Sequence, residues 1–396
     1  MGHGMDEAIA FITKSLSLED IRYDFQKNNK LVSQPISLAL VFISGKHQKA
    51  YREILTLIDE IFHPQQFVGC SSSGVIGNHK EYEDETAISV LLLPFPKLKA
   101  TIQTVTQNFL DESSGPGFWH YETECSPESV QGVFIFADPF TMRVQQLTEQ
   151  LSNAYPDVPM IGGMATSGSG EYQTFLFHNQ DILTTGALVV FLEGPYQVRT
   201  LVSQGCKPIG KPYAITQATE NVIHRLDDNS ALIALTQLFT QIDDTTRKQI
   251  RNNLYLGLAI HDYRKNFQLG DFLIHNIIGI NEEIGSLVIG MRPRNNQMVQ
   301  FHMRDPNVAI QQLDFSLNQL KSQIHPSQIK AALLCLCNGR GKTLYGKPHN
   351  DIRYLEKELG PLPLVGFFCN GEIGPIGNRI YTHGYTACAA FLIEEN

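Results

Sequence analysis

The sequence has no long apolar run and no excess of positive charge, and each absence excludes a class of protein. The longest apolar runs, such as Val90 to Leu93 and Leu38 to Ile43, are far shorter than the roughly 20 residues that a membrane-spanning helix needs. The net charge of −9 disfavours binding to a phosphate backbone, because that needs a concentrated basic face. We therefore expect no membrane insertion and no nucleic-acid partner.

The sequence also lacks a signal peptide and low-complexity tracts. Asp6 and Glu7 stand where a secretory signal would begin with basic residues, which predicts a cytoplasmic protein. Hydrophobic residues make up 42% of the chain and charged residues 18%, as expected for packed globular domains rather than a disordered chain.

Cysteines are few and odd in number. Of the seven, Cys335, Cys337, Cys369 and Cys388 lie in apolar, strand-like runs where thiols pack as small hydrophobic groups. Cys335 and Cys337 are not matched by a second pair at zinc spacing. We expect reduced thiols and no metal site.

One structural unit is repeated three times in this sequence. Short apolar runs typical of buried strands occupy residues 38–43, 132–137 and 331–337. Each is followed by an amphipathic helical pattern, a return strand, a glycine-rich turn and a closing strand. The turns are FVGCSSSGVIG from Phe67, MIGGMATSGSG from Met160 and LVGFFCNGEIG from Leu364. Such repetition predicts internal duplication.

The predicted fold is α/β of mixed α+β character: repeated β-α-β-β modules form mixed sheets covered by helices on one face, in two domains with internal pseudo-duplication. We divide the chain into an N-terminal extension (1–30), an N-terminal domain with two modules (31–200) and a C-terminal domain with the third (201–396). The modules begin about 95 and then about 200 residues apart, and further predicted helices and strands fill the wider gap.

The glycine-rich turns do not match known phosphate or nucleophile motifs. Val75 stands where a phosphate-binding loop needs lysine, and Ser73 stands where a nucleophile elbow needs glycine. Gly341-Lys342-Thr343 resembles the end of a phosphate-binding loop, but the earlier glycine position holds Leu336. We interpret the shared glycines as tight turns.

The third module differs from the other two by its polar groups. Glu372 takes the position of Val75, and Asn370 precedes it in the turn. The loop after the first strand is also longer, running from Asn338 to Asp351, and His383 follows in a later turn. Enlarged polar loops on a repeated scaffold are a common way to build a binding site. Arg340, Lys342, His349 and Asp351 lie in this loop.

A further polar cluster surrounds His302 and Arg304, which are two residues apart and would share one face of a strand. Arg304 either pairs with Asp305 or Asp351, or binds a ligand carboxylate, and His302 is either a core histidine or a ligand group. Arginine together with a carboxylate suits a zwitterion such as an amino acid. The candidate ligand-binding residues are His302, Arg304, Arg340, His349, Asp351, Asn370, Glu372 and His383.

Several motifs resemble the FIST domain family, in both its N-terminal and its C-terminal parts. The motifs are VGCSSSGVIG from Val68, GDFLIHNIIGIN from Gly270, VQFHMRD from Val299, CNGRG from Cys337, PHND from Pro348, PLVGFFCNGEIGPIG from Pro363 and YTHGYT from Tyr381. The resemblance covers about residues 30 to 395. It implies an intracellular signal-input protein that binds a small ligand such as an amino acid and relays to a separate signalling partner.

Two alternatives remain open. Some relatives in this family resemble haem-binding nitric oxide sensors that regulate a histidine kinase, which would make haem a cofactor. The axial ligand would be His178, His261, His302, His349 or His383, and the absence of a C-x-x-C-H motif implies non-covalent binding.

The second alternative is an enzyme with His349, Asp351, Glu372 and His383 as acid and base groups. No nucleophile stands out, because Glu372 would raise the pKa of the neighbouring Cys369 thiol. We expect a non-catalytic sensor.

Overall fold

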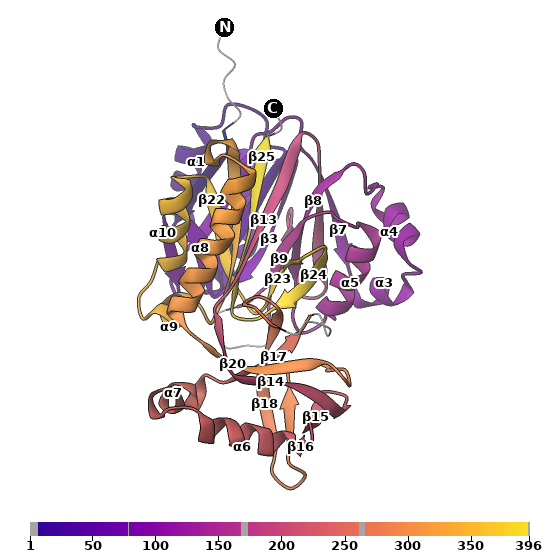
Figure 1. Cartoon of the computed structure of the whole chain (residues 1–396). Helices are drawn as coiled ribbons and strands as arrows, with labels where there is room; N and C mark the ends of the chain where they lie inside the picture. Colours follow the sequence, from indigo (N-terminus) through magenta and orange to yellow (C-terminus); the bar gives the residue numbers. More distant parts are fainter. Residues whose placement is uncertain (1–6, 78, 168–172, 261–265, 395–396) are drawn as a thin grey trace. The chain divides into compact units, whose positions relative to one another are not determined.

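The computed structural model describes residues 7–77, 79–167, 173–260 and 266–394. They form two compact units. The first contains residues up to Val202, Phe315–Thr382 and the chain from Thr386 onward, and the second contains Ser203–Asp314 with His383–Tyr385. Each unit is described by itself (Figure 1).

Three copies of one module build the first unit. Each copy has an edge strand, one or two helices, a central strand, one or two further helices, a parallel strand, a hairpin and a closing strand. The first copy is β1 (Ile9–Thr13), α1 (Leu18–Asn29), β2 (Leu38–Ser44), α2 (Tyr51–Phe62), β3 (Gln66–Ser72), β4 (Gly74–Gly77), β5 (Lys80–Glu83) and β6 (Ile88–Leu93).

The second and third copies repeat this order. The second is β7 (Lys99–Val105), α3 (Gln107–Glu112), α4 (Pro116–Thr123), β8 (Val130–Ala137), α5 (Val144–Ala154), β9 (Met160–Met164), β10 (Leu176–His178), β11 (Asp181–Leu183) and β12 (Ala187–Glu193). The third is β13 (Tyr196–Gln204), α8 (Pro306–Gln323), β21 (Ile329–Cys337), α9 (Gly341–Tyr345), α10 (Asn350–Leu359), β22 (Leu364–Cys369), β23 (Glu372–Ile376), β24 (Arg379–His383) and β25 (Thr386–Glu394).

Each copy contributes the same three strands to the middle of one sheet. The central strand is parallel to the strand that follows it and antiparallel to the closing strand, as in β6-β2-β3. The other two sheets contain β12-β8-β9 and β25-β21-β22 in the same arrangement. These central strands are almost continuously apolar, as expected for strands that are buried on both faces.

The hairpins are exchanged around the three sheets. The hairpin β4-β5 of the first copy joins the sheet of the third copy, β10-β11 of the second joins the first, and β23-β24 of the third joins the second. The exchange is cyclic, so each copy completes the sheet of another. None of the three modules has its full sheet without its neighbours.

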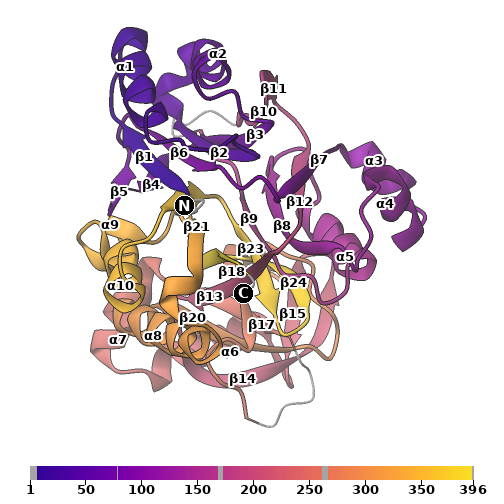
Figure 2. The same ribbon diagram turned by 90° about the horizontal axis from the view of Figure 1, so that it is seen from above.

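The inner faces of the three sheets share one core, whereas helices cover their outer faces. Phe42, Phe136 and Phe367, one from each copy, have ring centroids 4.6 to 5.8 Å apart. Figure 2 shows the helices of the three copies on the outer side of their sheets. Ile21, Phe25 and Ile58 on α1 and α2, for example, are completely buried against the first sheet. The predicted α/β modules with helices on one face are confirmed.

The second unit contains a seven-stranded sheet in the order β14-β20-β17-β18-β19-β15-β16, and it carries the short helices α6 and α7. The strands are β14 (Cys206–Thr219), β15 (Val222–Leu226), β16 (Asn229–Ser230), β17 (Tyr255–Ala259), β18 (Phe272–Asn281), β19 (Ser286–Ile289) and β20 (Met298–Arg304), and the helices are α6 (Ala231–Gln241) and α7 (Asp244–Gln249). The sheet closes on itself because β14 pairs with β20 along its first part and with β15 along its second. Leu235 and Leu238 of α6 are buried in the same core as Phe301 of β20.

The unequal spacing of the modules has a structural reason. The chain leaves the third copy after β13, forms the second unit, and returns along α8. The predicted strands and helices of this region are confirmed, but their insertion into the third copy was not predicted. The stretch predicted as an N-terminal extension supplies β1 and α1 of the first copy. The division of the domains at residue 200 stays a prediction.

Among the described residues, none of the helices is both long enough and apolar enough to span a membrane.

Candidate functional site

The glycine-rich turns of the three copies meet where the parallel strands end. The backbone N–H of Ser73 donates to Thr166 Oγ1 at 2.7 Å, and Thr166 Oγ1 donates to the carbonyl of Phe368 at 3.0 Å. The N–H of Asn370 donates to the carbonyl of Met164 at 3.0 Å. Ligand sites in α/β folds lie at the carboxyl ends of the strands, which makes this edge the candidate binding region.

Three exposed or partly exposed polar side chains line the edge. The Ser73 hydroxyl donates to Asn338 Oδ1 at 2.8 Å, which joins the first copy to the enlarged loop of the third. Asn370, in the turn of the third copy, is exposed. Hydroxyl and amide groups both donate and accept hydrogen bonds, so this edge can bind uncharged polar groups.

Arg340 and Asp351 form an ion pair beneath the enlarged loop, and both side chains are at most 1% exposed. Arg340 Nη2 and Nε lie 2.6 and 3.0 Å from the two carboxylate oxygens, and Nη2 also donates to the Tyr345 hydroxyl at 2.8 Å. Burial lowers the pKa of Arg340, but the Asp351 carboxylate outweighs burial and the net pKa is raised. The stretch predicted as one enlarged loop contains α9 and the start of α10, with Arg340 directly before α9 and Asp351 in the first turn of α10. Their paired geometry holds the loop together.

A glutamate of the first copy fixes the same loop. Glu81, on the exchanged strand β5, is 1% exposed and accepts the backbone N–H groups of His349 at 2.8 Å and Ile352 at 3.0 Å. Burial, followed by the charge of Asp351, raises the pKa of Glu81 to about 7. Glu83 accepts the N–H of Lys342 at 3.0 Å. Sequence reasoning missed both glutamates, because only the hairpin exchange brings them to this loop.

Glu372 begins β23 in the turn of the third copy. It is completely buried, and its Oε2 accepts the backbone N–H of Thr386 at 3.0 Å. No described residue donates a hydrogen bond of normal geometry to Oε1. Burial raises the pKa of Glu372 well above its usual value, although the Thr386 N–H, Arg340 and the Cys337 thiol each lower it.

Pairing of the strands confirms that Glu372 and Val75 are equivalent. Val75 pairs with Phe367 of β22, and Glu372 pairs with Gly163, which holds the matching position on β9. Both side chains are completely buried. The scaffold thus accepts a plain apolar residue at the position where the third copy holds an acid. A buried polar group without a partner costs free energy, so packing alone does not explain Glu372.

The other three predicted residues belong to the second unit. His302 is 3% exposed, and its ring packs against Phe272 and over Gly257, where a Cβ would lie 2.6 Å from the ring. Burial lowers the pKa of His302 to about 4, so it is a neutral core histidine. Arg304 lies over the ring of Tyr385 at 5.3 Å, and its Nε donates to Asn253 Oδ1 at 3.3 Å.

His383 belongs to the same unit as His302 and Arg304, and it is 5% exposed. The acid and base set predicted from the sequence is thus divided: Asp351 is held by Arg340, His349 Nδ1 accepts the N–H of Glu81 at 2.9 Å, and His383 lies in the second unit. Burial raises the pKa of Cys369 well above its usual value, which agrees with an inert thiol.

The histidines considered for haem are engaged in packing and hydrogen bonds where they are described. His178 Nε2 lies 3.3 Å from Gln66 Oε1, and His302 Nδ1 lies 2.9 Å from the carbonyl of Gln300. His261 lies outside the described residues. These contacts do not single out one histidine as an axial ligand.

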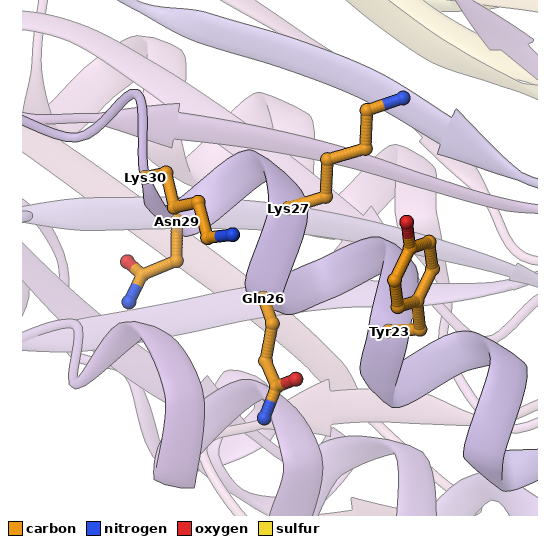
Figure 3. A pocket seen from close by; sticks show the side chains of 5 residues that line it. All are labelled: Tyr23, Gln26, Lys27, Asn29 and Lys30. Atoms are coloured by element: carbon orange, nitrogen blue, oxygen red, sulfur yellow. The ribbon is translucent and has the colours of Figure 1, made fainter.

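A surface hollow of about 390 Å³ lies on α1, far in sequence from the candidate residues. Tyr23, Gln26, Lys27, Asn29 and Lys30 line it (Figure 3). None of the predicted ligand-binding residues contributes to this hollow, and its lining comes from α1 and the Lys30 that follows it.

Comparison with known proteins places the chain in a family. The FIST N domain matches residues 37–229, and the FIST C domain matches residues 231–375. The chain belongs to the FIST family. FIST domains are associated with sensing in signal transduction. The boundary between the two matched domains falls inside the second unit of this FIST protein.

The relatives of this FIST protein include two uncharacterized proteins of Mycobacterium tuberculosis. Each is 29% identical, over 370 and 358 residues, which covers 93% and 90% of this chain and 94% and 91% of the relatives. An F-box/LRR-repeat protein of Arabidopsis thaliana is 24% identical over 151 residues, 35% of this chain and 28% of that protein. A crystal structure of cyanuric acid hydrolase from A. caulinodans is 8% identical with a TM-score of 0.40, covering 98% of this chain and 99% of that one.

Proposed function

We propose that this FIST protein is an intracellular sensor whose first unit binds a small polar metabolite, such as an amino acid, at the edge where the three glycine-rich turns meet. The bound state would be relayed to a separate signalling protein, such as a histidine kinase. The observation that carries the proposal is Glu372, a completely buried acid whose Oε1 accepts no hydrogen bond of normal geometry from a described residue, at the position where the first copy holds Val75.

Asn370 adds the second group of the proposed site. It departs from Ser73 and Thr166 at the equivalent positions and is exposed two residues before Glu372. A ligand at this edge can therefore meet an accessible amide first and the buried acid second. Well-placed polar groups of this kind orient a ligand within a pocket.

Arg340 and Asp351 act on the ligand indirectly in this proposal. Both are committed to each other in a buried pair, so neither is offered as a direct contact. Their role, with His349 and Glu81, is to hold the enlarged loop that carries Asn338. Arg304 is assigned to Tyr385 in the second unit rather than to a ligand carboxylate.

A thermal-shift screen tests the proposal. A metabolite whose free concentration is a hundred times its Kd stabilises the folded protein by about 2.7 kcal/mol, which raises Tm measurably. We expect the shift given by the best metabolite to fall by more than half in Asn370→Ala and in Glu372→Val. Asn29→Ala, on the surface of α1, is the matched control and should keep the full shift.

Two results would defeat the proposal. One is an equal shift in the wild type and both site variants, and the other is no shift with amino acids, amines, small acids or sugars. The haem alternative is tested on the same preparation: protein from haem-supplemented cells that shows a strong Soret band would favour haem instead.

A further inference from the structure

A group of exposed cations surrounds the outer part of the enlarged loop. Lys80 stands on β5 of the first copy, and Lys342 and Arg353 stand on α9 and α10 of the third copy. All three residues are exposed. Figure 2 shows β5, α9 and α10 side by side. Lys80, Lys342 and Arg353 together are called the basic face below.

Hydrogen bonds and charge place the basic face around one histidine. Lys80 directly precedes Glu81, whose N–H donates to His349 Nδ1 at 2.9 Å. The N–H of Arg353 donates to the His349 carbonyl at 3.3 Å. Burial lowers the pKa of His349, and the positive charges of the basic face lower it further. The three cations therefore act together on one part of the surface, although they come from distant parts of the sequence.

The ion pairs near the basic face use other residues. Glu85 pairs with Lys14 at 2.6 Å, and Glu356 pairs with His79 at 2.5 Å. Among the residues that the structure describes, none forms an ion pair with a cation of the basic face. The whole chain has a net charge of −9, so the basic face is a local group of cations on an acidic protein.

The backbone N–H groups beside these cations are already bonded. Glu83 accepts the N–H of Lys342 at 3.0 Å, and Glu81 accepts the N–H of His349 at 2.8 Å. The likeness of the Lys342 segment to the end of a phosphate-binding loop therefore does not extend to its chemistry, because a phosphate is cradled by backbone N–H groups. Recognition at the basic face depends on its charged side chains.

We propose that the basic face docks an acidic segment of the partner protein, rich in aspartate and glutamate. Cations on three separate elements match several carboxylates along one extended segment rather than a single small anion. The loop that carries Lys342 also carries Asn338 at the proposed ligand edge, which links the two surfaces through one element. This inference rests on the proposed function for the existence of a partner, but its test needs no metabolite.

Two peptides of equal length test the inference on the full chain. Labelled hexaglutamate carries the acidic side chains, and labelled hexaglutamine replaces each of them with a neutral amide. We expect fluorescence anisotropy to show binding of hexaglutamate alone, with an affinity that falls as salt is added, because exposed charges are screened. In an NMR titration of the wild type, the amide shifts that change should belong to β5, α9 and α10.

A pair of double variants locates the binding. An exposed ion pair contributes about 1.4-fold to fivefold in affinity, so Lys80→Gln combined with Arg353→Gln should weaken hexaglutamate binding about fivefold. Lys27→Gln combined with Lys30→Gln is the matched control, because it changes the net charge by the same amount at exposed lysines of another surface. This control should bind as the wild type does. Both double variants should keep the wild-type Tm, since all four side chains are exposed.

The outcomes separate this inference from its alternatives. An equal loss of affinity in the two double variants would show that net charge attracts the peptide, and the inference would be wrong. Absence of hexaglutamate binding at low salt would overturn it as well. Tighter binding of an oligothymidine of the same charge would assign the basic face to phosphate groups instead. If a metabolite raises Tm but hexaglutamate does not bind, the docking inference fails while the sensor proposal stands.

Discussion

Glu81 and His349 hold each other by their backbones and side chains. The N–H of Glu81 donates to His349 Nδ1 at 2.9 Å, and the N–H of His349 donates to Glu81 Oε2 at 2.8 Å. The two residues are 268 positions apart, in the first and third copies of the module. His349 adopts a φ of 68°, so the reciprocal bonds also stabilise an uncommon backbone conformation at the start of α10.

We expect Glu81 to make the stability of the fold depend on pH. Its pKa of about 7 in the folded state lies above the ordinary value of 4.5 in the unfolded chain, so the folded state binds the extra proton between these values. The free energy of unfolding therefore falls as pH rises from about 4.5 to about 7. From pH 5 to pH 8, Glu81 contributes a loss of about 2 to 3 kcal/mol.

Glu81→Gln should flatten this dependence. Urea unfolding at several pH values should show a smaller loss between pH 5 and pH 8 in the variant than in the wild type. Glu60→Gln is the control: the Glu60 carboxylate is half exposed and pairs with Arg22, so this variant should keep the wild-type slope. Parallel pH curves for Glu81→Gln and the wild type would show that Glu81 does not titrate in this range.

Breaking the buried pair of the loop should destabilise the protein strongly. Arg340→Met leaves the Asp351 carboxylate buried without a cation, and such a change costs about 3 to 5 kcal/mol. The exposed pair of Arg292 and Glu220 is the control, and Arg292→Met should cost less than about 1 kcal/mol. Chemical denaturation of both variants measures the difference. If Arg340→Met and Arg292→Met lower the free energy of unfolding equally, solvent reaches the Arg340 pair.

The candidate site shows how far sequence reasoning reaches. Asn370 and Glu372 were found by comparing the three glycine-rich turns, because a departure from a repeat is visible in one sequence. Glu81 was not found, because its role depends on β5 joining the sheet of another copy. Arg340 was predicted to bind a ligand anion, whereas the structure shows its guanidinium paired with Asp351.

For the fold as well, local sequence patterns were predictable and pairing between distant segments was not. The buried strands and amphipathic helices have strong local patterns, and the structure confirms them as β2, α2 and their equivalents. Edge strand β7 is mostly half-buried and has no such pattern, so it was missed. Pairing between distant segments, such as Val75 with Phe367, is not encoded by periodicity along the chain.

The third prediction concerns the close approach of sheets in the shared core. A Cβ at Gly163 would lie 2.4 Å from Cys369 Sγ, which is closer than packed atoms allow. Gly163→Ala should therefore lower the free energy of unfolding by about 1 to 3 kcal/mol. Gly117→Ala, where no atom lies within 4 Å of the new Cβ, should be neutral or slightly stabilising.

The pairing with Cys369 can be tested in the same series. Gly163→Ala combined with Cys369→Ala removes the sulfur that the new methyl group meets. The double variant should lose less free energy of unfolding than the two single variants lose together. The effects of substitutions at two residues in contact are not additive. If the losses measured by urea unfolding are additive, the destabilisation by Gly163→Ala does not come from contact with Cys369.

The last prediction follows from the insertion of the second unit. The two ends of the inserted segment lie side by side, because the N–H of Asp305 donates to the carbonyl of Gly205 at 3.0 Å. A short linker can therefore join these two residues without distortion, and insertions with adjacent ends are commonly removable. We expect a chain without residues 206–304, closed by two glycines, to fold cooperatively with the three modules intact.

Tyr385 needs one accompanying change, because its partners Tyr255 and Asn276 are removed with the insertion. Tyr385→Ser avoids a newly exposed aromatic ring, and the same substitution in the full chain is the control. Circular dichroism and thermal unfolding should show one cooperative transition in the shortened protein. A broad transition without defined Tm would mean that the third copy depends on its insertion for folding, and that the repeated modules alone do not specify the first unit.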